Sequence, residues 1–258
     1  NNFIYYVLGK KERHTLADYV TGVEETSTNK IVLYSSAQTG KTTELKQLCW
    51  ELQQSGLYLP VSFEVRTNTK LKRDDLPESQ YVDGREVVLV IDALDEVNGQ
   101  KYEDLLEEIG GYAYEHPEMK MVLSCRSNFR RERQLELFTE LFLEELSIDD
   151  ARDYAAKREV NSDRFMRSVF ANQLEDFIKN PFFLSVLIDA YKGKGKQLPK
   201  TKADIYKLFI KSSYDKEVKE KNVSLSAQHS FEESVRLLER VALGLSLMNA
   251  QSLNKEEL

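Results

Sequence analysis

The segment Lys30-Ile-Val-Leu-Tyr34 leads directly into Ser35-Ser-Ala-Gln-Thr-Gly-Lys-Thr-Thr43. Its first part is an apolar, β-branched run of strand length, and its second part is a short run of small and polar residues. The apolar residues that follow recur at helical spacing and are Leu45, Leu48, Cys49 and Leu52. A strand, a tight loop and a helix in this order predict a phosphate-binding loop, because the loop N–H groups and the helix N-terminus both point at an anion.

Lys41 and Thr42 are the two side chains that such a loop uses. Lys41 is expected to contact the β- and γ-phosphates of a nucleotide, and Thr42 to place its hydroxyl on Mg²⁺. The other loop residues expected to contact the nucleotide are Ala37, Gln38, Thr39, Gly40 and Thr43. The pattern G-x-x-x-x-G-K-[ST] has glycine where this chain has Ser35. The alternative is a chance Gly-Lys-Thr after a strand, and the next two strands argue against it.

A second apolar run, Glu86-Val-Val-Leu-Val-Ile91, is typical of a strand buried on both faces of a parallel sheet. It ends in Asp92-Ala-Leu-Asp95-Glu96, at the edge where ligands bind in open α/β sheets. Asp92 is expected to hold the Mg²⁺ shell. Asp95 and Glu96 are expected to polarise the attacking water. The alternative is that these acids cap the next expected helix, residues 102–114.

A third strand end carries the opposite charge. Lys120-Met-Val-Leu-Ser-Cys125 has the pattern of a buried strand and is followed by Arg126. A guanidinium at this edge is suited to contact the γ-phosphate and to report its presence or loss. The alternative is a solvated loop arginine, since other arginines follow closely at Arg130, Arg131 and Arg133.

Strand and helix patterns alternate from about residue 3 to residue 146, which predicts an α/β fold with a parallel sheet and helices on both of its faces. The expected strands are Lys30–Tyr34, Leu59–Val65, Val87–Ile91, Lys120–Cys125 and a weaker one at Leu141–Leu146. The charged run Thr67–Val82, which contains Pro77, is expected to be a loop.

From Ser147 onward the pattern is helical only. Ser147-Ile-Asp-Asp150 is a helix start, with a serine cap and acids in the first turn. The basic run Lys192-Gly-Lys-Gly-Lys-Gln197 has no aromatic residues between its charges, so it indicates a solvated linker rather than a nucleic-acid-binding patch. Three domains are therefore expected, at residues 1–146, 147–197 and 198–258. The helices expected after Ser147 are Ala151–Arg158, Ser162–Asn172, Leu174–Lys179, Pro181–Lys192, Lys202–Lys219 and Ser230–Met248.

The composition is that of a soluble, cytoplasmic protein. The chain has 258 residues and a net charge of −7, and its longest apolar runs fall far short of a membrane span. Cys49 and Cys125 are expected to be small core residues in a reducing compartment. The histidines His14, His116 and His229 lack ligand spacing, so the only metal expected is the Mg²⁺ that accompanies a nucleotide. The missing initiator Met indicates that residues were removed from the N-terminus.

Residues 88–97, VLVIDALDEV, resemble the NACHT family of NTPases. That family belongs to the STAND class, the signal-transduction ATPases with numerous domains, and is related to the AAA+ enzymes. Four further segments are similar to parts of the family pattern: the turn beside the adenine, the sensor-1 strand end, the helical motif whose proline packs on the base, and the start of the winged-helix domain. These segments are Val7–Glu12, Ser124–Arg126, Asn180–Leu184 and Leu198–Thr201. Lys10 stands where the family usually has an arginine.

The resemblance implies a switch operated by nucleotide, in which ATP or ADP binds with Mg²⁺ beside Gly9 and Pro181 and ATP is hydrolysed slowly. Arg126 would report the γ-phosphate. The ATP form would assemble into a homo-oligomer and drive an effector domain, with a sensor domain also outside this chain. Relatives of this kind act in antiphage defence in bacteria and in innate immunity in animals. Residues 198–258 would form an incomplete winged-helix domain in a fragment of a longer protein, with Ser252–Leu258 starting another helix.

Three other classes of protein remain open. An AAA+-like motor that remodels protein or DNA needs an arginine finger and a second-sensor arginine in the helical lid. One could come from the cluster Arg152, Arg158, Arg164 and Arg167, for which the alternative is a solvated helix face. A GTPase fits less well, because no Asn-Lys-x-Asp follows a strand. A scaffold that does not hydrolyse nucleotide is disfavoured by the complete set of acidic and basic residues. Neither a membrane nor a nucleic acid is expected as a direct partner of the switch.

Overall fold

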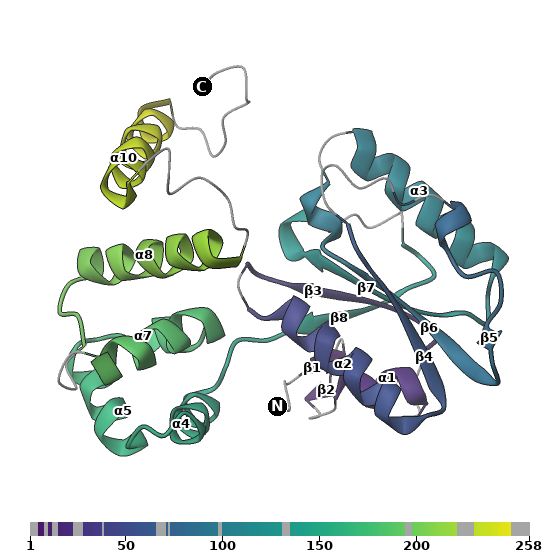
Figure 1. The fold of residues 1–258 in the computed structure, drawn as a ribbon, viewed down its shortest axis with the longest axis horizontal. Helices are drawn as coiled ribbons and strands as arrows, with labels where there is room; N and C mark the ends of the chain where they lie inside the picture. Colours follow the sequence, from purple (N-terminus) through teal and green to yellow (C-terminus); the bar gives the residue numbers. More distant parts are fainter. Residues whose placement is uncertain are drawn as a thin grey trace. The chain divides into compact units, whose positions relative to one another are not determined.

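Figure 1 shows the computed structural model, which describes residues 5–7, 10–11, 15–22, 28–37, 39–65, 71, 73–97, 100–130, 135–193, 198–220 and 230–248. The chain divides into two compact units. The first contains Asn1–Ala151 and Lys179–Phe182, and the second contains Arg152–Ile178 and Phe183–Leu258. The β-sheet belongs to the first unit. The expected boundaries at residues 146 and 197 stay predictions.

The sheet has the strand order β2-β1-β8-β3-β7-β6-β4, with β5 paired to β6 outside this path. Its strands are β1 (Tyr5–Val7), β2 (Lys10–Lys11), β3 (Lys30–Ser35), β4 (Tyr58–Glu64), β5 (Tyr81–Val82), β6 (Arg85–Asp92), β7 (Lys120–Arg126) and β8 (Thr139–Leu143). The adjacent strands β8, β3, β7, β6 and β4 all pair in parallel. The expected α/β fold with a parallel sheet is therefore confirmed.

Two predictions about the strands were wrong. The last parallel strand is Thr139–Leu143 rather than Leu141–Leu146, and it ends where the exposed Glu144 and Glu145 begin. The expected loop Thr67–Val82 contains, in its described part, the 3₁₀ turn Arg73–Asp75 and strand β5. Strand β5 pairs antiparallel with β6. The sequence analysis also missed the antiparallel pairs of β1 with β2 and with β8.

The hairpin between β5 and β6 has a simple local cause. Asp83 and Gly84 connect the two strands with φ angles of 49° and 74°. Both angles lie in the left-handed region, as a two-residue type I′ hairpin turn requires, and Asp-Gly is a residue pair that favours this turn. The signal for this hairpin was therefore present in the sequence.

Helices cover both faces of the sheet. Helices α1 (Leu16–Thr21) and α2 (Lys41–Ser55) pack on one face, and α3 (Gln100–Glu115) packs on the other. Successive residues of β3 point to opposite faces, with Ile31 and Leu33 toward α1 and α2 and Val32 and Tyr34 on the face of α3. A strand buried on both faces needs apolar side chains throughout, and this requirement explains the continuous apolar runs.

Past β8, every regular element in the described part of the chain is a helix. These helices are α4 (Ile148–Lys157), α5 (Ser162–Ala171), α6 (Glu175–Ile178), α7 (Pro181–Gly193), α8 (Lys202–Glu220) and α10 (Phe231–Met248). In the second unit the Phe183 and Phe209 rings stack at 4.1 Å between centroids, and Phe177 packs on both. The expected helical region is confirmed here, whereas residues 194–197 of the expected linker and the expected helix start Ser252–Leu258 lie outside the described residues.

Two smaller expectations are also met. The Ser147 hydroxyl accepts a hydrogen bond from the Asp150 N–H, and the Asp150 carboxylate accepts one from the Ser147 N–H, so Ser147 caps α4. Cys125 is buried in the core beneath α3, and Cys49 packs against the core of the other face. Both thiols are free. They are small core residues, as expected.

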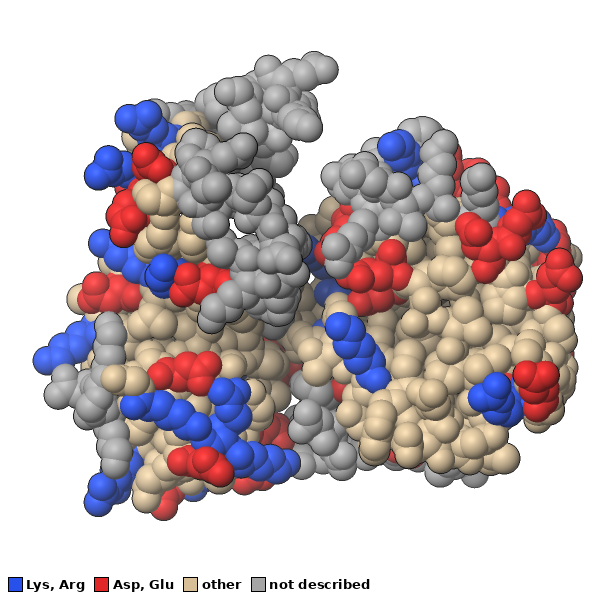
Figure 2. All heavy atoms as spheres, in the orientation of Figure 1, with Lys and Arg blue, Asp and Glu red and all other residues tan. Residues whose placement is uncertain are grey.

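The surface of the second unit carries charges of both signs. On the face shown in Figure 2, Lys and Arg side chains of the second unit lie among its Asp and Glu side chains. Among the helices that the structure describes, none has the length and apolar character needed to cross a membrane.

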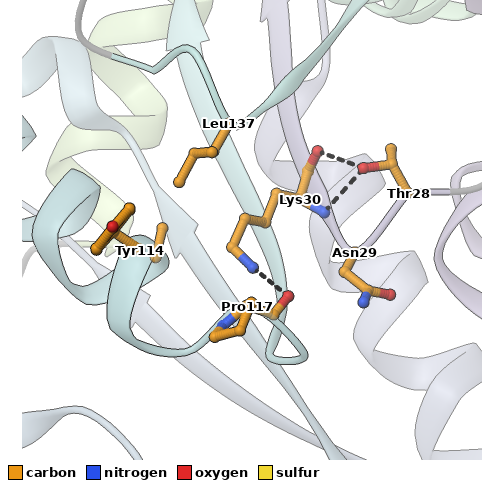
Figure 3. A pocket seen from close by; sticks show the side chains of 7 residues that line it. Thr28, Asn29, Lys30, Tyr114, Pro117 and Leu137 are labelled. Atoms are coloured by element: carbon orange, nitrogen blue, oxygen red, sulfur yellow. Dashed lines mark hydrogen bonds between the residues drawn. The ribbon is translucent and has the colours of Figure 1, made fainter.

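Lys30 is a buried charged residue, only 5% exposed, at the start of β3. Its ammonium donates to the carbonyl oxygens of Pro117, His116 and Met119, at 2.7, 3.1 and 3.4 Å. These carbonyls lie in the turn that follows the C-terminus of α3, where the His116 carbonyl also accepts from the Met119 N–H. Lys30 also lines a cavity of about 430 Å³ with Tyr114, Leu137 and neighbouring residues (Figure 3). This cavity lies where β3 begins, at the end of the strand opposite the loop that leads into α2.

Replacing Lys30 with Met is expected to lower the free energy of unfolding by about 1–3 kcal/mol, because partly buried carbonyl groups lose hydrogen bonds from a charged donor. Denaturant unfolding of the variant and the wild type measures this difference. Lys46→Met, at an exposed position on α2, is the matched control and is expected to be nearly neutral. Equal stability of Lys30→Met and Lys46→Met would show that the hydrogen bonds from Lys30 to these carbonyl groups do not stabilise the fold.

Candidate functional site

The residues singled out in the sequence meet at one edge of the sheet. In the parallel pairing of β3 with β7, Ser35 is the partner of Arg126. In the pairing of β4 with β6, Glu64 is the partner of Asp92. Strand β7 lies between β3 and β6. The loop after β3, Asp92 at the end of β6 and Arg126 at the end of β7 therefore share the edge at which open α/β sheets bind ligands.

The loop after β3 turns sharply into α2. Gly40 has φ 101° and ψ 17°, a left-handed conformation that glycine adopts without steric cost. Helix α2 begins at the next residue, and no side chain among the described residues caps its N-terminus. The first-turn N–H groups of a 15-residue helix are consequently available to an anion. Thr42 and Thr43 lie exposed in this turn.

Ser35 has a contact role that the glycine of the usual pattern cannot have. Its side-chain oxygen lies 2.6 Å from Thr39 Oγ1 and accepts a hydrogen bond of 3.1 Å from Lys41 Nζ. Ser35 and Thr39 are 2% and 3% exposed. The loop is thus closed on itself by two buried hydroxyls, and that of Ser35 holds the lysine.

Burial and the charges of Asp92, Asp95 and Arg126 shift the pKa of Lys41. Burial is the main cause that lowers the pKa of Lys41. The carboxylates of Asp95 and Asp92 act in the opposite direction, while Arg126 lowers the pKa further. A bound anion would favour the charged lysine, since an opposite charge stabilises the protonated form.

Asp92 is fixed by a neighbouring strand. Ser124, which is fully buried on β7, donates a short hydrogen bond from Oγ to the Asp92 carboxylate and accepts one of 3.0 Å from the Ala93 N–H. Ala93 has φ 65°, an unfavourable left-handed conformation for a residue with a Cβ. The sequence analysis named Ser124 only as part of the segment similar to the sensor-1 strand end and did not foresee its contact with Asp92, although a serine in an otherwise apolar buried strand was a usable signal.

Asp95 pairs with Arg126. The Arg126 backbone N–H donates to Asp95 Oδ1 at 2.9 Å, and Arg126 Nε lies 2.8 Å from Asp95 Oδ2. Asp95 is 7% exposed, and it belongs to the 3₁₀ turn Leu94–Glu96 that follows β6. Glu96, next in the turn, is exposed. Sequence reasoning expected Asp95 to face the attacking water and did not foresee this pairing.

The residue before Pro181 contacts the loop that follows β3. Asn180 donates from Nδ2 to the Ala37 carbonyl at 3.3 Å, and its Oδ1 accepts from the Phe182 N–H at 2.9 Å. Pro181 is the first residue of α7, a position that suits its missing N–H. Asn180 therefore caps α7 and touches the loop at the same time. Two other expected contact residues, Gly9 and Gln38, lie outside the described residues.

The donor set fits Mg²⁺ held together with a nucleotide. Among the described residues, no group of three or more His, Cys, Asp or Glu side chains could hold a metal by itself. Mg²⁺ keeps several waters and is usually bound through one or two carboxylates plus substrate phosphates. Asp92 and Thr42 are the residues at this edge that suit such a shell.

A scan against models of known protein families found no match to this chain. A search of curated proteins found no match either. The geometry of the site is consequently the basis on which a function is assigned.

Replacing Ser124 with Ala is expected to lower the free energy of unfolding by about 1–3 kcal/mol, because the partly buried Ala93 N–H and the buried Asp92 carboxylate lose a hydrogen-bonding partner. Denaturant unfolding measures the loss. Ser127→Ala, at an exposed position just after β7, is the control and is expected to be within experimental error of the wild type. If both variants unfold together with the wild type, Ser124 does not fix this turn.

Proposed function

We propose that this protein is a P-loop NTPase that binds ATP or ADP with Mg²⁺ and hydrolyses ATP slowly. The observation that carries the proposal is the meeting of three strand ends at one edge. Lys41 follows β3, Asp92 ends β6, and Arg126 ends β7 between them. A lysine at the N-terminus of a helix without a side-chain cap, a carboxylate and a guanidinium provide the charges that phosphoryl transfer requires.

In this proposal each residue has one task. Lys41 and the first-turn N–H groups of α2 bind the phosphates, and Thr42 and Asp92 hold the metal shell. When bound, Mg²⁺ neutralises charge on the β- and γ-phosphate oxygens. Glu96 orients the attacking water and accepts its proton. Arg126 contacts the γ-phosphate, where its charge stabilises the transition state. Phosphoryl transfer depends mainly on such positioning and charge neutralisation.

We further propose that the enzyme is a regulatory switch of the NACHT type in the STAND class. The resemblance of residues 88–97 to that family supports this proposal, as does the position of Asn180 and Pro181. Helix α7 starts at Pro181, beside the phosphate loop, and most of its length belongs to the second unit. A change in the loop on nucleotide binding would thus act on a helix shared by both units. The remaining parts of the proposal are a winged-helix domain from residue 198, homo-oligomerisation in the ATP form, and effector and sensor domains in the longer protein.

Two of the arginines that a motor could use, Arg152 and Arg158, have acidic partners within the second unit. Arg158 Nη2 lies 2.7 Å from the Asp189 carboxylate, and Arg158 Nη1 donates to the Tyr154 hydroxyl at 3.0 Å. Arg152 lies 4.0 Å from Asp163. These contacts favour the switch over the AAA+-like motor.

The choice between switch and motor is tested by identifying the nucleotide released when the purified protein is denatured and by measuring the steady-state hydrolysis rate. Co-purified ADP and slow turnover are expected.

Replacing Lys41 with Ala is expected to weaken binding of ATP with Mg²⁺ by about 2–4 kcal/mol, because the phosphates lose the charge at the centre of the loop. Calorimetric titration measures the affinity. Lys46→Ala removes a lysine from the exposed side of the same helix and is expected to bind like the wild type. An unchanged affinity in Lys41→Ala would refute the phosphate-loop assignment.

Glu96→Gln is expected to bind ATP with wild-type affinity and to lose turnover, since orientation of the water matters in the transition state more than in the ground state. Asp92→Asn is expected to lose Mg²⁺-dependent binding and hydrolysis together. Parallel measurements of nucleotide affinity and phosphate release separate the two effects. Wild-type turnover in Glu96→Gln would mean that another residue holds the water.

A further inference from the structure

The pairing of Asp95 with Arg126 engages both oxygens of one buried carboxylate. Oδ1 accepts from the Arg126 backbone N–H at 2.9 Å, and Oδ2 lies 2.8 Å from Nε of the same residue. The side chain of Asp95 is 4% exposed, whereas that of Arg126 is 45% exposed. The contact therefore holds the inner part of the arginine and leaves the outer part toward solvent.

This arrangement orients the guanidinium. The guanidinium is planar and carries five N–H donors in a fixed fork. With Nε held against Asp95, rotation of the plane is restricted, and the edge of the guanidinium between Nη1 and Nη2 is turned away from the Nε contact. Two parallel N–H groups of this kind match the spacing of phosphate oxygens.

The carboxylate itself is on a rigid support. It lies in the 3₁₀ turn Leu94–Glu96, in which the Glu96 N–H donates to the Ala93 carbonyl at 3.0 Å. Leu94 and Val97, on either side of the pair of acids, are 0% and 4% exposed. A charged group that must meet a ligand in a fixed geometry needs a support whose own conformation is locked by packing.

The pairing also offsets the repulsion between two cations. Arg126 lowers the pKa of Lys41 and Asp95 raises it, so the three charges act on one another within the site. Asp95 reduces the repulsion between the lysine that binds the phosphates and the arginine beside it. A carboxylate with both oxygens used in this way is poorly placed to accept a proton from water as well.

We propose that Asp95 is a positioning residue that holds Arg126 toward the γ-phosphate and thereby sets the preference of the site for ATP over ADP. The inference rests on the proposed nucleotide-binding function. It assigns the orientation of the attacking water to Glu96 alone, and it makes Asp95 act through Arg126.

The test measures affinities for ADP and for an ATP analogue with a non-hydrolysable β–γ bridge, both with Mg²⁺. Asp95→Asn is nearly isosteric: its Oδ1 still accepts from the Arg126 N–H, but an NH₂ group now faces Nε. The analogue is expected to bind about tenfold more weakly, the effect of losing one hydrogen bond to a charged group, with ADP affinity nearly unchanged. Arg126→Ala is expected to reduce the same preference for the analogue over ADP. The variant that combines Asp95→Asn with Arg126→Ala is expected to show no further loss of this preference, because the two residues act as a unit. Asp153→Asn, an exposed carboxylate on α4, is the control.

Three results would overturn the inference. A rise in the preference for the analogue in Asp95→Asn would make Asp95 a competitor of the phosphate for Arg126. A loss of ATP turnover at an unchanged preference would place Asp95 on the water. If Asp95→Asn weakens the binding of both nucleotides equally, and its effect adds to that of Arg126→Ala, Asp95 has a structural role only. Absence of any nucleotide binding by the wild type would instead refute the proposed function on which the inference rests.

Discussion

Parallel pairing of β3 with β7 and of β7 with β6 places residues from three distant parts of the chain at one edge of the sheet. Side-chain direction alternates along each strand, so a register shift of one residue would turn Asp92 or Arg126 to another face. The register is fixed because both faces of these strands are buried beneath helices. Packing of the hydrophobic core and placement of the charged site are therefore set by the same pairing.

The charges at this edge stabilise one another in a partly buried setting. Asp95 compensates Arg126, Ser124 supports Asp92, and Ser35 holds Lys41 against the loop. A buried charge without a partner is costly, and each of these groups has one. The edge can therefore keep a lysine, an arginine and two carboxylates together without a ligand. An incoming anion would add to this network at Lys41 and Arg126.

Two residues at this edge have left-handed backbone conformations. Gly40 turns the chain into α2, and Ala93 turns it from β6 into the 3₁₀ turn that carries Asp95. Glycine adopts such a conformation freely, whereas alanine does so at a cost of about 1–2 kcal/mol. The hydrogen bond from the Ala93 N–H to Ser124 helps to hold the less favourable of the two. Backbone strain that persists beside charged side chains is a common property of functional sites.

The sequence by itself determined the parallel sheet, the approximate positions of its five parallel strands, and the location of Asp92 and Arg126 at strand ends and of Lys41 at the start of a helix. Apolar periodicity and strand termini are local properties of the chain. The hairpin at Asp83-Gly84 was also encoded locally but was not recognised. Only the tertiary structure decided that Asp95 pairs with Arg126, 31 positions away, and that Asn180 meets Ala37, 143 positions away. Such contacts depend on which strands and helices become neighbours, and no local pattern of residues specifies that.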